Sequence, residues 1–182
     1  MLAAASYARA LGITMETIKA GLEKITEIKG RVQKIKNDLG LEVIVDYAHT
    51  PDSLKALYTA FPNKKKICVL GSCGGGRDKW KRKAMAVVAE QYCDQIILTD
   101  EDPYDDDPRE IVNSLAKEIK NKKPKIIMDR RQAIAEAIRS AKSDTAVLIT
   151  GKGTDPYIMR ANGQKESWSD ARVAEEEMAK IK

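Results

Sequence analysis

The chain alternates between short, continuous apolar runs and longer amphipathic segments. The apolar runs are KKICVL at 65–70, QIILT at 95–99, KIIM at 125–128 and TAVLIT at 145–150. A continuous apolar run bounded by polar residues is typical of a strand that is buried on both faces, as in a parallel sheet. The amphipathic segments between them predict helices from Pro51 to about Ala60, over about 80–91, from Pro108 to about Ile119 and over 130–141.

Strands that alternate with helices of about 10–12 residues indicate a parallel sheet covered on both faces. We therefore expect a doubly wound, mostly parallel, Rossmann-like α/β domain. VQKI at 32–35 and LEVIVDYA at 41–48 add a hairpin with NDLG as its turn. A second hairpin around Asn162-Gly163 and a final helix from Asp170 follow the last buried strand.

A short helical segment is predicted before this domain. Residues 2–11 are Ala-rich and stop at Gly12, which suits a helix C-terminus. Thr14 caps a second helix, whose apolar face consists of Ile18, Leu22 and Ile25.

Composition excludes several classes of protein. The chain is 43% apolar and 32% charged, which is typical of a folded core rather than of disorder. No run approaches the ~18 apolar residues of a membrane span, and the N-terminus lacks the basic and apolar regions of a signal peptide. Three cysteines without metal-ligand spacing, and a single histidine, predict a reduced, cytoplasmic protein without a metal site of its own.

The net charge of +5 is explained either by solvated lysine-rich surfaces or by a polyanionic partner. Only 5% of the residues are aromatic, and no recognition-helix motif is visible. The acidic run EDPYDDDPRE at 101–110 would repel a phosphate backbone. We expect small phosphorylated ligands rather than nucleic acid.

The unusual chemistry of the sequence follows the predicted strands. DYAHTPD at 46–52, GSCGGGRDKWKR at 71–82, TDEDP at 99–103 and GKGTDP at 151–156 all begin at or near the end of a strand. Open parallel sheets bind ligands beyond the carboxyl ends of their strands. These segments therefore predict one binding edge.

The glycine-rich segment at 71–82 precedes a helix, where a backbone can approach an anion closely. It matches neither the dinucleotide fingerprint nor the P-loop, so a tight turn is the structural alternative. The adjacent Arg77, Asp78 and Lys79 favour binding of an anion or carboxylate. His49 has no serine or cysteine nucleophile with it, which argues against covalent acyl chemistry.

The ordered series GR at 30–31, DYAHTPD, GSCGGGRDKWKR, TDEDP, DR at 129–130 and GKGTDPYI resembles the C-terminal domain of the Mur ligases. It is most similar to the UDP-N-acetylmuramyl-tripeptide synthetases, which add the third amino acid of the peptidoglycan stem peptide. The resemblance assigns 30–182 to that domain and 1–29 to a helical tail of the central ATP-binding domain. The family's P-loop and carbamylated lysine lie in the central domain, so we expect this chain alone to be inactive.

The resemblance implies a cytoplasmic ligase that uses ATP and Mg²⁺, with UDP-muramoyl-dipeptide and a diamino acid as substrates. The central and N-terminal Mur ligase domains are its implied partners. It implies nucleotide contacts from Arg31, Asp46, Tyr47 and His49. It implies amino-acid contacts from Arg77, which would receive the carboxylate, and from Glu101, Asp102, Pro103, Tyr104, Gly151 and Asp155.

Relatives that take meso-diaminopimelate carry Asp-Asn-Pro-Arg where this chain has Glu101 to Tyr104. Tyrosine cannot replace a bidentate cation, and Asp102, Asp155 and the acidic stretch Asp105–Asp107 should repel a distal carboxylate. We therefore expect L-lysine or a similar diamine such as ornithine to be preferred. Within the ligases, a folylpolyglutamate or cyanophycin-type enzyme is the alternative. Outside them, a non-catalytic nucleotide-binding module or an NAD-type domain has the same expected fold.

Overall fold

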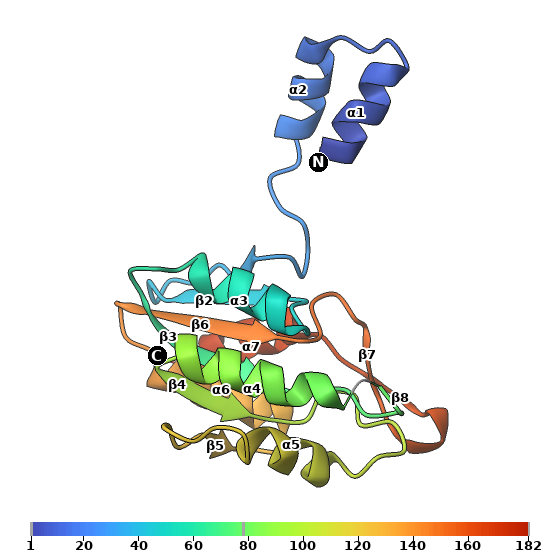
Figure 1. Ribbon diagram of the computed structural model, residues 1–182. Helices are drawn as coiled ribbons and strands as arrows, with labels where there is room; N and C mark the ends of the chain where they lie inside the picture. The colour runs from blue at the N-terminus through green and yellow to red at the C-terminus, as the bar shows by residue number, and fades with distance from the viewer. Residues whose placement is uncertain (1, 78, 182) are drawn as a thin grey trace.

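The computed structural model describes residues 2–77 and 79–181, and its main body is a sheet between two layers of helices (Figure 1). The strands lie in the order β1-β2-β6-β3-β4-β5. Their bounds are β1 Gln33–Lys34, β2 Glu42–Asp46, β3 Lys65–Leu70, β4 Gln95–Leu98, β5 Lys125–Ile126 and β6 Thr145–Thr150. All neighbours are parallel except β1, which forms the predicted antiparallel hairpin with β2.

Helices cover both faces of the sheet, which confirms the predicted doubly wound fold. One face packs against α3 Pro51–Thr59, α4 Trp80–Tyr92 and α5 Pro108–Ala116. The other packs against α6 Arg130–Ser140 and α7 Asp170–Ala179. In β3, Cys68 and Leu70 face the first layer, whereas Ile67 and Val69 face the second. Because both sets are buried, the strand is apolar throughout.

The last strand of the sheet, β6, lies between β2 and β3, so Leu148 is level with Ile44 on one side and Cys68 on the other. The segment that follows β6 therefore emerges between the ends of β2 and β3. This topology brings three of the predicted binding segments to one place.

The two N-terminal helices, α1 Leu2–Ala10 and α2 Met15–Glu23, stand apart from the sheet (Figure 1). Thr14 caps α2 by accepting the amide N–H of Thr17, as predicted. Ile25 lies beyond the end of α2 and is 50% exposed, so it is not part of the expected apolar helix face. Large apolar side chains are exposed on or beside these helices, namely Leu2, Tyr7, Leu11, Ile13 and Met15.

Several predicted elements are shorter than expected. Helix α5 ends at Ala116 rather than near Ile119, and the two edge strands, β1 and β5, cover two residues each. The second hairpin forms a separate two-stranded sheet of β7 Tyr157–Met159 and β8 Lys165–Ser167. None of the described helices is both long and apolar enough to cross a bilayer.

The expectation of reduced cysteines is wrong for two of the three. Cys68 in β3 and Cys93 at the end of α4 form a disulfide, and both are fully buried. The sequence gives no indication of this pair, because the two residues are 25 positions apart and meet only when α4 packs on the sheet. Cys73 is the free cysteine.

Candidate functional site

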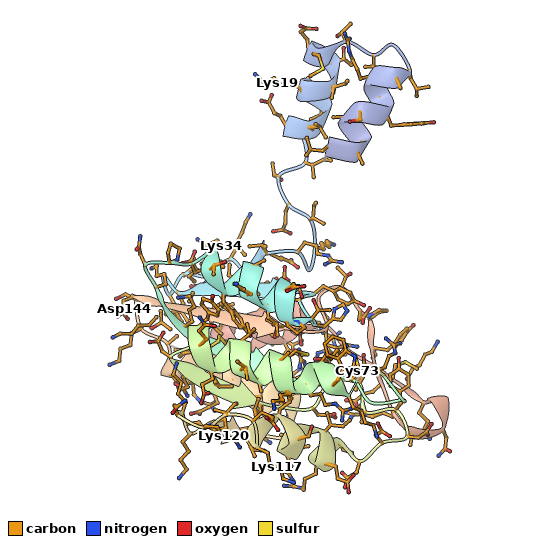
Figure 2. All side chains as sticks on the ribbon, viewed as in Figure 1. Lys19, Lys34, Cys73, Lys117, Lys120 and Asp144 are labelled. Atoms are coloured by element: carbon orange, nitrogen blue, oxygen red, sulfur yellow. A yellow bond between two sulfur atoms is a disulfide. The ribbon has the colours of Figure 1, made fainter. Side chains whose placement is uncertain are left out.

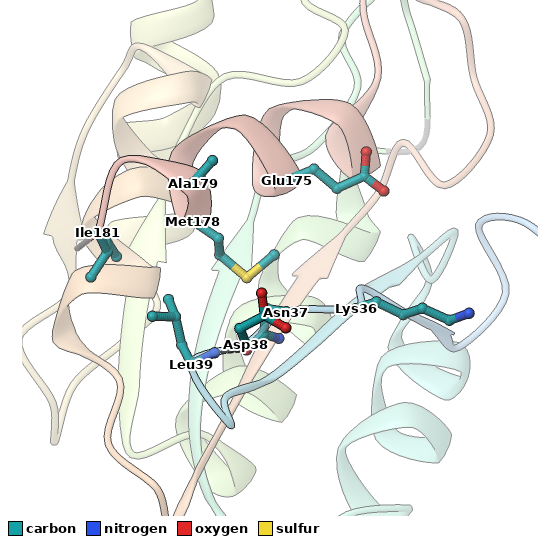
Figure 3. A pocket seen from close by; sticks show the side chains of 8 residues that line it. All are labelled: Lys36, Asn37, Asp38, Leu39, Glu175, Met178, Ala179 and Ile181. Carbon is teal, nitrogen blue, oxygen red and sulfur yellow. Dashed lines mark hydrogen bonds between the residues drawn. The ribbon is translucent and has the colours of Figure 1, made fainter.

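The predicted binding segments meet at the carboxyl ends of the strands. Figure 2 shows Cys73, which follows β3, and Asp144, which precedes β6, at opposite ends of the sheet. A groove of about 320 Å³ lies on the other side of the molecule, between the turn after β1 and the end of α7 (Figure 3). None of the predicted site residues lines that groove.

A buried ion pair joins Asp102, in the loop after β4, to Lys152, in the loop after β6. The Lys152 ammonium lies 2.8 Å from each carboxylate oxygen of Asp102 and 3.4 Å from Asp155. The side chain of Lys152 is 1% exposed and that of Asp102 is 8% exposed. Asp102 is therefore not a free negative charge, which removes one of the reasons for expecting repulsion of a second substrate carboxylate.

Glu101 is enclosed by two glycines. A Cβ on Gly71 would lie 2.7 Å from the Glu101 side chain, and one on Gly151 would lie 2.1 Å from its Oε2. The thiol of Cys73 donates to Oε1 at 3.2 Å, while Oε2 is buried without a partner among the described residues. Burial raises the pKa of Glu101 and also that of the Cys73 thiol, because it disfavours the charged form of each group.

Arg77 is exposed and reaches toward the loop that follows β4. Its guanidinium lies 5.8 Å from the centre of the Tyr104 ring and donates to the Tyr104 hydroxyl at 3.4 Å. Tyr104 has a positive φ of 53°, and its ring packs against Gly75 where a Cβ would fit poorly. Pro103 is buried next to Gly74. Asp78, the neighbour of Arg77 that sequence analysis also singled out, lies outside the described residues.

The four residues predicted for the nucleotide lie together at the end of β2. The Arg31 guanidinium stacks on the Tyr47 ring at 4.7 Å, and that ring meets His49 edge to face at 4.6 Å. Asp46 uses both carboxylate oxygens on the backbone, accepting Val32 N–H at 2.7 Å and Ala48 N–H at 2.8 Å. Asp46 thus fixes the two segments that present Arg31 and Tyr47.

The two clusters share the loop after β6. Gly30 has a φ of +60° and touches Gly153 so closely that a Cβ would lie 2.5 Å from its carbonyl carbon. Gly153 in turn packs against the Cβ of Tyr47. Burial is the main reason that the pKa of Tyr47 is raised, and Asp155 adds to the effect. The residues 151–155 therefore join the Arg31 side of the edge to the Glu101 side.

Arg82, Arg130 and Lys152 are buried, which sequence analysis did not predict. Arg130 donates to both carboxylate oxygens of Asp170, at 2.8 and 2.7 Å, and to the Thr150 carbonyl at 2.8 Å. Arg82 donates to the Cys73 carbonyl at 2.8 Å. Their positions in helices next to polar loops were visible, but charged residues are usually exposed, so burial was not expected.

Comparison with known proteins identifies the family of this chain. Residues 30–153 match the family described as "Mur ligase, glutamate ligase domain", which is more than half of the chain. The chain belongs to this family. As a Mur ligase domain, it is 40% identical over 176 residues to the UDP-N-acetylmuramoyl-L-alanyl-D-glutamate–2,6-diaminopimelate ligase of Clostridioides difficile, covering 94% of this chain and 36% of that protein. The corresponding ligase of Lactiplantibacillus plantarum is 44% identical over 160 residues, covering 86% of this chain and 32% of that protein.

Solved structures have the same fold. A UDP-N-acetylmuramoyl-L-alanyl-D-glutamate–2,6-diaminopimelate ligase superposes with a TM-score of 0.76 and 29% identity over 98% of this chain and 37% of that chain. A bifunctional folylpolyglutamate synthase/dihydrofolate synthase from Yersinia pestis matches with a TM-score of 0.59 and 18% identity, over 76% of this chain and 32% of that chain, which shows the fold alone. The chain spans roughly a third of the length of all these proteins.

Proposed function

We propose that this chain is the amino-acid-binding third domain of an ATP-dependent ligase that adds a diamino acid to UDP-N-acetylmuramoyl-dipeptide in peptidoglycan synthesis. The observation that carries the proposal is the contact of exposed Arg77 with half-buried Tyr104, which follows the buried residues Glu101–Pro103 at the sheet edge. This edge lies in a chain that is 40% identical to a ligase named for that reaction.

The two sides of the edge have separate roles in this proposal. Arg77 binds the carboxylate of the incoming amino acid, because a guanidinium offers two parallel donors to a carboxylate. The substrate side chain lies against Glu101, Asp102, Pro103 and Tyr104, with Gly151 at its base. Asp155, whose side chain is 41% exposed, is the acid available to a substrate amine.

Arg31, Tyr47 and His49 fit a nucleotide, since they offer an exposed cation and aromatic surface next to one another. ATP supplies the phosphoryl group that activates the dipeptide carboxylate. We assign Asp46 to positioning rather than to the metal, because backbone amides occupy both of its oxygens. Asp102 is likewise paired with Lys152, so we propose that Mg²⁺ is held mainly by parts of the enzyme outside this chain.

Residues 1–29 are proposed to be the last helices of the central domain, and 30–182 the third domain. The exposed apolar side chains of α1 and α2 support this, because such a surface is normally covered. The central and N-terminal domains are then the partners of this chain. We propose that the complete enzyme acts in the cytoplasm.

Two diamino acids are candidates for the substrate of the complete enzyme. The names of the Clostridioides and Lactiplantibacillus relatives favour 2,6-diaminopimelate, and the Lys152–Asp102 pair weakens the charge argument against it. L-Lysine is favoured by Tyr104, which stands where a second carboxylate would need an arginine. Comparing kcat/KM of the complete enzyme for the two amino acids decides between them.

Substitution of Arg77 tests the proposed function. In the complete enzyme, Arg77→Ala should raise the KM for the amino acid about 30- to 1,000-fold, the loss expected for a charge-assisted bidentate contact. The KM for ATP should stay within about twofold. Arg172→Ala is the matched control, because Arg172 is an exposed arginine that pairs with Glu176 on α7. A weaker affinity for ATP with unchanged amino-acid affinity would assign Arg77 to the phosphate site.

A second experiment concerns the isolated chain. It should form no amide bond from ATP, dipeptide and diamino acid, because its sequence contains no G-x-x-x-x-G-K-[ST] loop to hold the phosphates. Measurable ATP-dependent product from the 182-residue protein would contradict this.

A further inference from the structure

Hydrogen bonds from the backbone of the β7–β8 hairpin segment attach it to the loop that follows β4. The Met159 amide donates to the Asp102 carboxylate at 2.8 Å, and the Met159 carbonyl accepts the Tyr104 amide at 3.1 Å. At the hairpin turn, the Asn162 amide donates to the Asp105 carboxylate at 2.7 Å. These contacts link segments that are more than fifty residues apart in the sequence, on both sides of Pro103.

Arg160 is the side chain that completes this attachment. Its guanidinium forms an ion pair with Asp100, at the end of β4, and donates to Glu166 on β8 at 2.7 Å. Asp100 in turn accepts the amide N–H of Glu101 at 2.9 Å. Arg160 is thus connected, through one carboxylate, to the first residue of the loop that the proposed function assigns to the amino acid.

The hairpin depends on these contacts for its position. Isolated two-stranded hairpins are marginally stable in water. Within β7 and β8, Ile158 is the described residue that is buried, at 1% exposure, whereas β8 is exposed throughout. With so little core of its own, the hairpin and the Asp100–Asp105 loop hold each other in place.

We propose that Arg160 is a positioning residue that sets the affinity for the amino acid by locking the Asp100–Asp105 loop against the β7–β8 hairpin. The inference rests on the proposed function, since it takes this loop as part of the amino-acid site. Arg160 itself acts through Asp100 and the hairpin. Loss of its guanidinium leaves Asp100, whose side chain is 10% exposed, without this ion-pair partner. The start of the loop is then no longer bound to the hairpin through Arg160.

The test uses the complete enzyme with Arg160→Ala and Arg160→Lys, and Arg172→Ala as the control for removal of an arginine from an exposed i,i+4 ion pair. Arg160→Ala should raise the KM for the amino acid about tenfold or more, as for other displaced binding groups, with the KM for ATP within about twofold. Arg160→Lys keeps the charge and should recover part of the affinity.

Hydrogen exchange gives a readout that does not need substrate. In Arg160→Ala, the amides of Tyr104 and Asn162 should exchange faster, because both donate across the contact between loop and hairpin. The amide of Ile149 in central strand β6 should not change. A general loss of stability would accelerate all three amides together.

Arg77→Ala, measured in parallel, separates the two proposals. If Arg77→Ala raises the amino-acid KM and Arg160→Ala does not, Arg160 is not a positioning residue and the inference is wrong. If neither substitution affects the amino-acid KM, the proposed amino-acid site fails as well. Equal KM values for Arg160→Ala and Arg160→Lys would also overturn the inference, since they would show that the charge has no part in it.

Discussion

The charged groups on the two sides of the binding edge differ in burial and in the groups that they contact. Around Asp102 and Lys152, the charged groups are buried and are neutralised by one another. Around Arg31 and Tyr47, the cation is exposed and rests on an aromatic ring. The first arrangement is complete within this chain, whereas the second offers an open surface to a ligand or to another domain.

The difference has an energetic meaning. Burying a charge costs free energy that only a well-placed partner offsets, so each ion of the buried side depends on its neighbour. An exposed cation stays hydrated and contributes little to folding. Substitutions on the buried side should therefore affect stability and binding together, whereas those on the exposed side should affect ligand binding alone.

The largest effect is expected from Lys152→Met. Removal of one member of a buried ion pair leaves the other charge uncompensated, at a cost of about 3–5 kcal/mol in the free energy of unfolding. Urea denaturation of this chain measures it. The double variant Lys152→Met/Asp102→Asn should recover at least half of the loss, because asparagine still accepts the Met159 amide. A single variant within about 1 kcal/mol of the parent would show that the pair is not buried in solution.

Loss of the disulfide between Cys68 in β3 and Cys93 at the end of α4 should have the next largest effect on stability. Cys68 and Cys93 close a loop of 25 residues that contains Cys73 and Arg77. In the loop-entropy account, such a crosslink stabilises the fold by about 3 kcal/mol. Addition of a reductant, or Cys68→Ala/Cys93→Ala, should lower the Tm accordingly. As the control, the reductant should leave the Tm of the double variant unchanged. Alkylation of three thiols in the unreduced, unfolded protein would show that the disulfide does not form.

A smaller effect of opposite sign is expected from Glu101→Gln. Because the pKa of Glu101 is raised in the folded chain, its ionisation costs stability as the pH rises above the ordinary value of 4.5. At pH 7 the variant should be more stable than the parent by an amount on the order of 1 kcal/mol. Near pH 4 the two should be equally stable. Denaturation at both pH values checks this, and a variant that is less stable at pH 7 would contradict it.

The smallest change in stability belongs to Arg31→Ala. An exposed cation stacked on an aromatic ring contributes about 0.5–1 kcal/mol, so the Tm of the chain should hardly move. In the complete enzyme the same substitution should weaken ATP binding about tenfold and leave the amino-acid KM unchanged. Binding of ATP measured by calorimetry is the test. Unchanged ATP affinity would remove Arg31 from the proposed nucleotide site.

Much of the fold could be predicted from local pattern. The buried strands β3, β4 and β6 were recognisable as continuous apolar runs, and Pro51 and Pro108 marked two helix starts. That the binding segments share one edge followed from the parallel sheet. The insertion of β6 between β2 and β3 could not be predicted, because strand order is determined by tertiary packing.

Pairings across the edge could not be predicted for the same reason. Lys152 and Asp102 are 50 residues apart, and a lysine beside glycines gives no sign that it will be buried. Asp46 was predicted to contact the nucleotide, and the structure places it beside Arg31 and Tyr47, two other residues of that prediction, with both of its oxygens bound to backbone amides. Its neighbourhood followed from the sequence, but its hydrogen-bond partners did not.

The position of β6 also has a consequence for how the chain folds. During synthesis on the ribosome, β2 emerges about 100 residues and β3 about 80 residues before β6 Thr145–Thr150, the strand that lies between them. Until that strand arrives, both of them have an open edge where it will insert. Sheets with such long-range pairing fold slowly and expose strand edges that aggregate. A chain truncated before Thr145 should therefore fail to form either half of the sheet, although it contains five of the six strands.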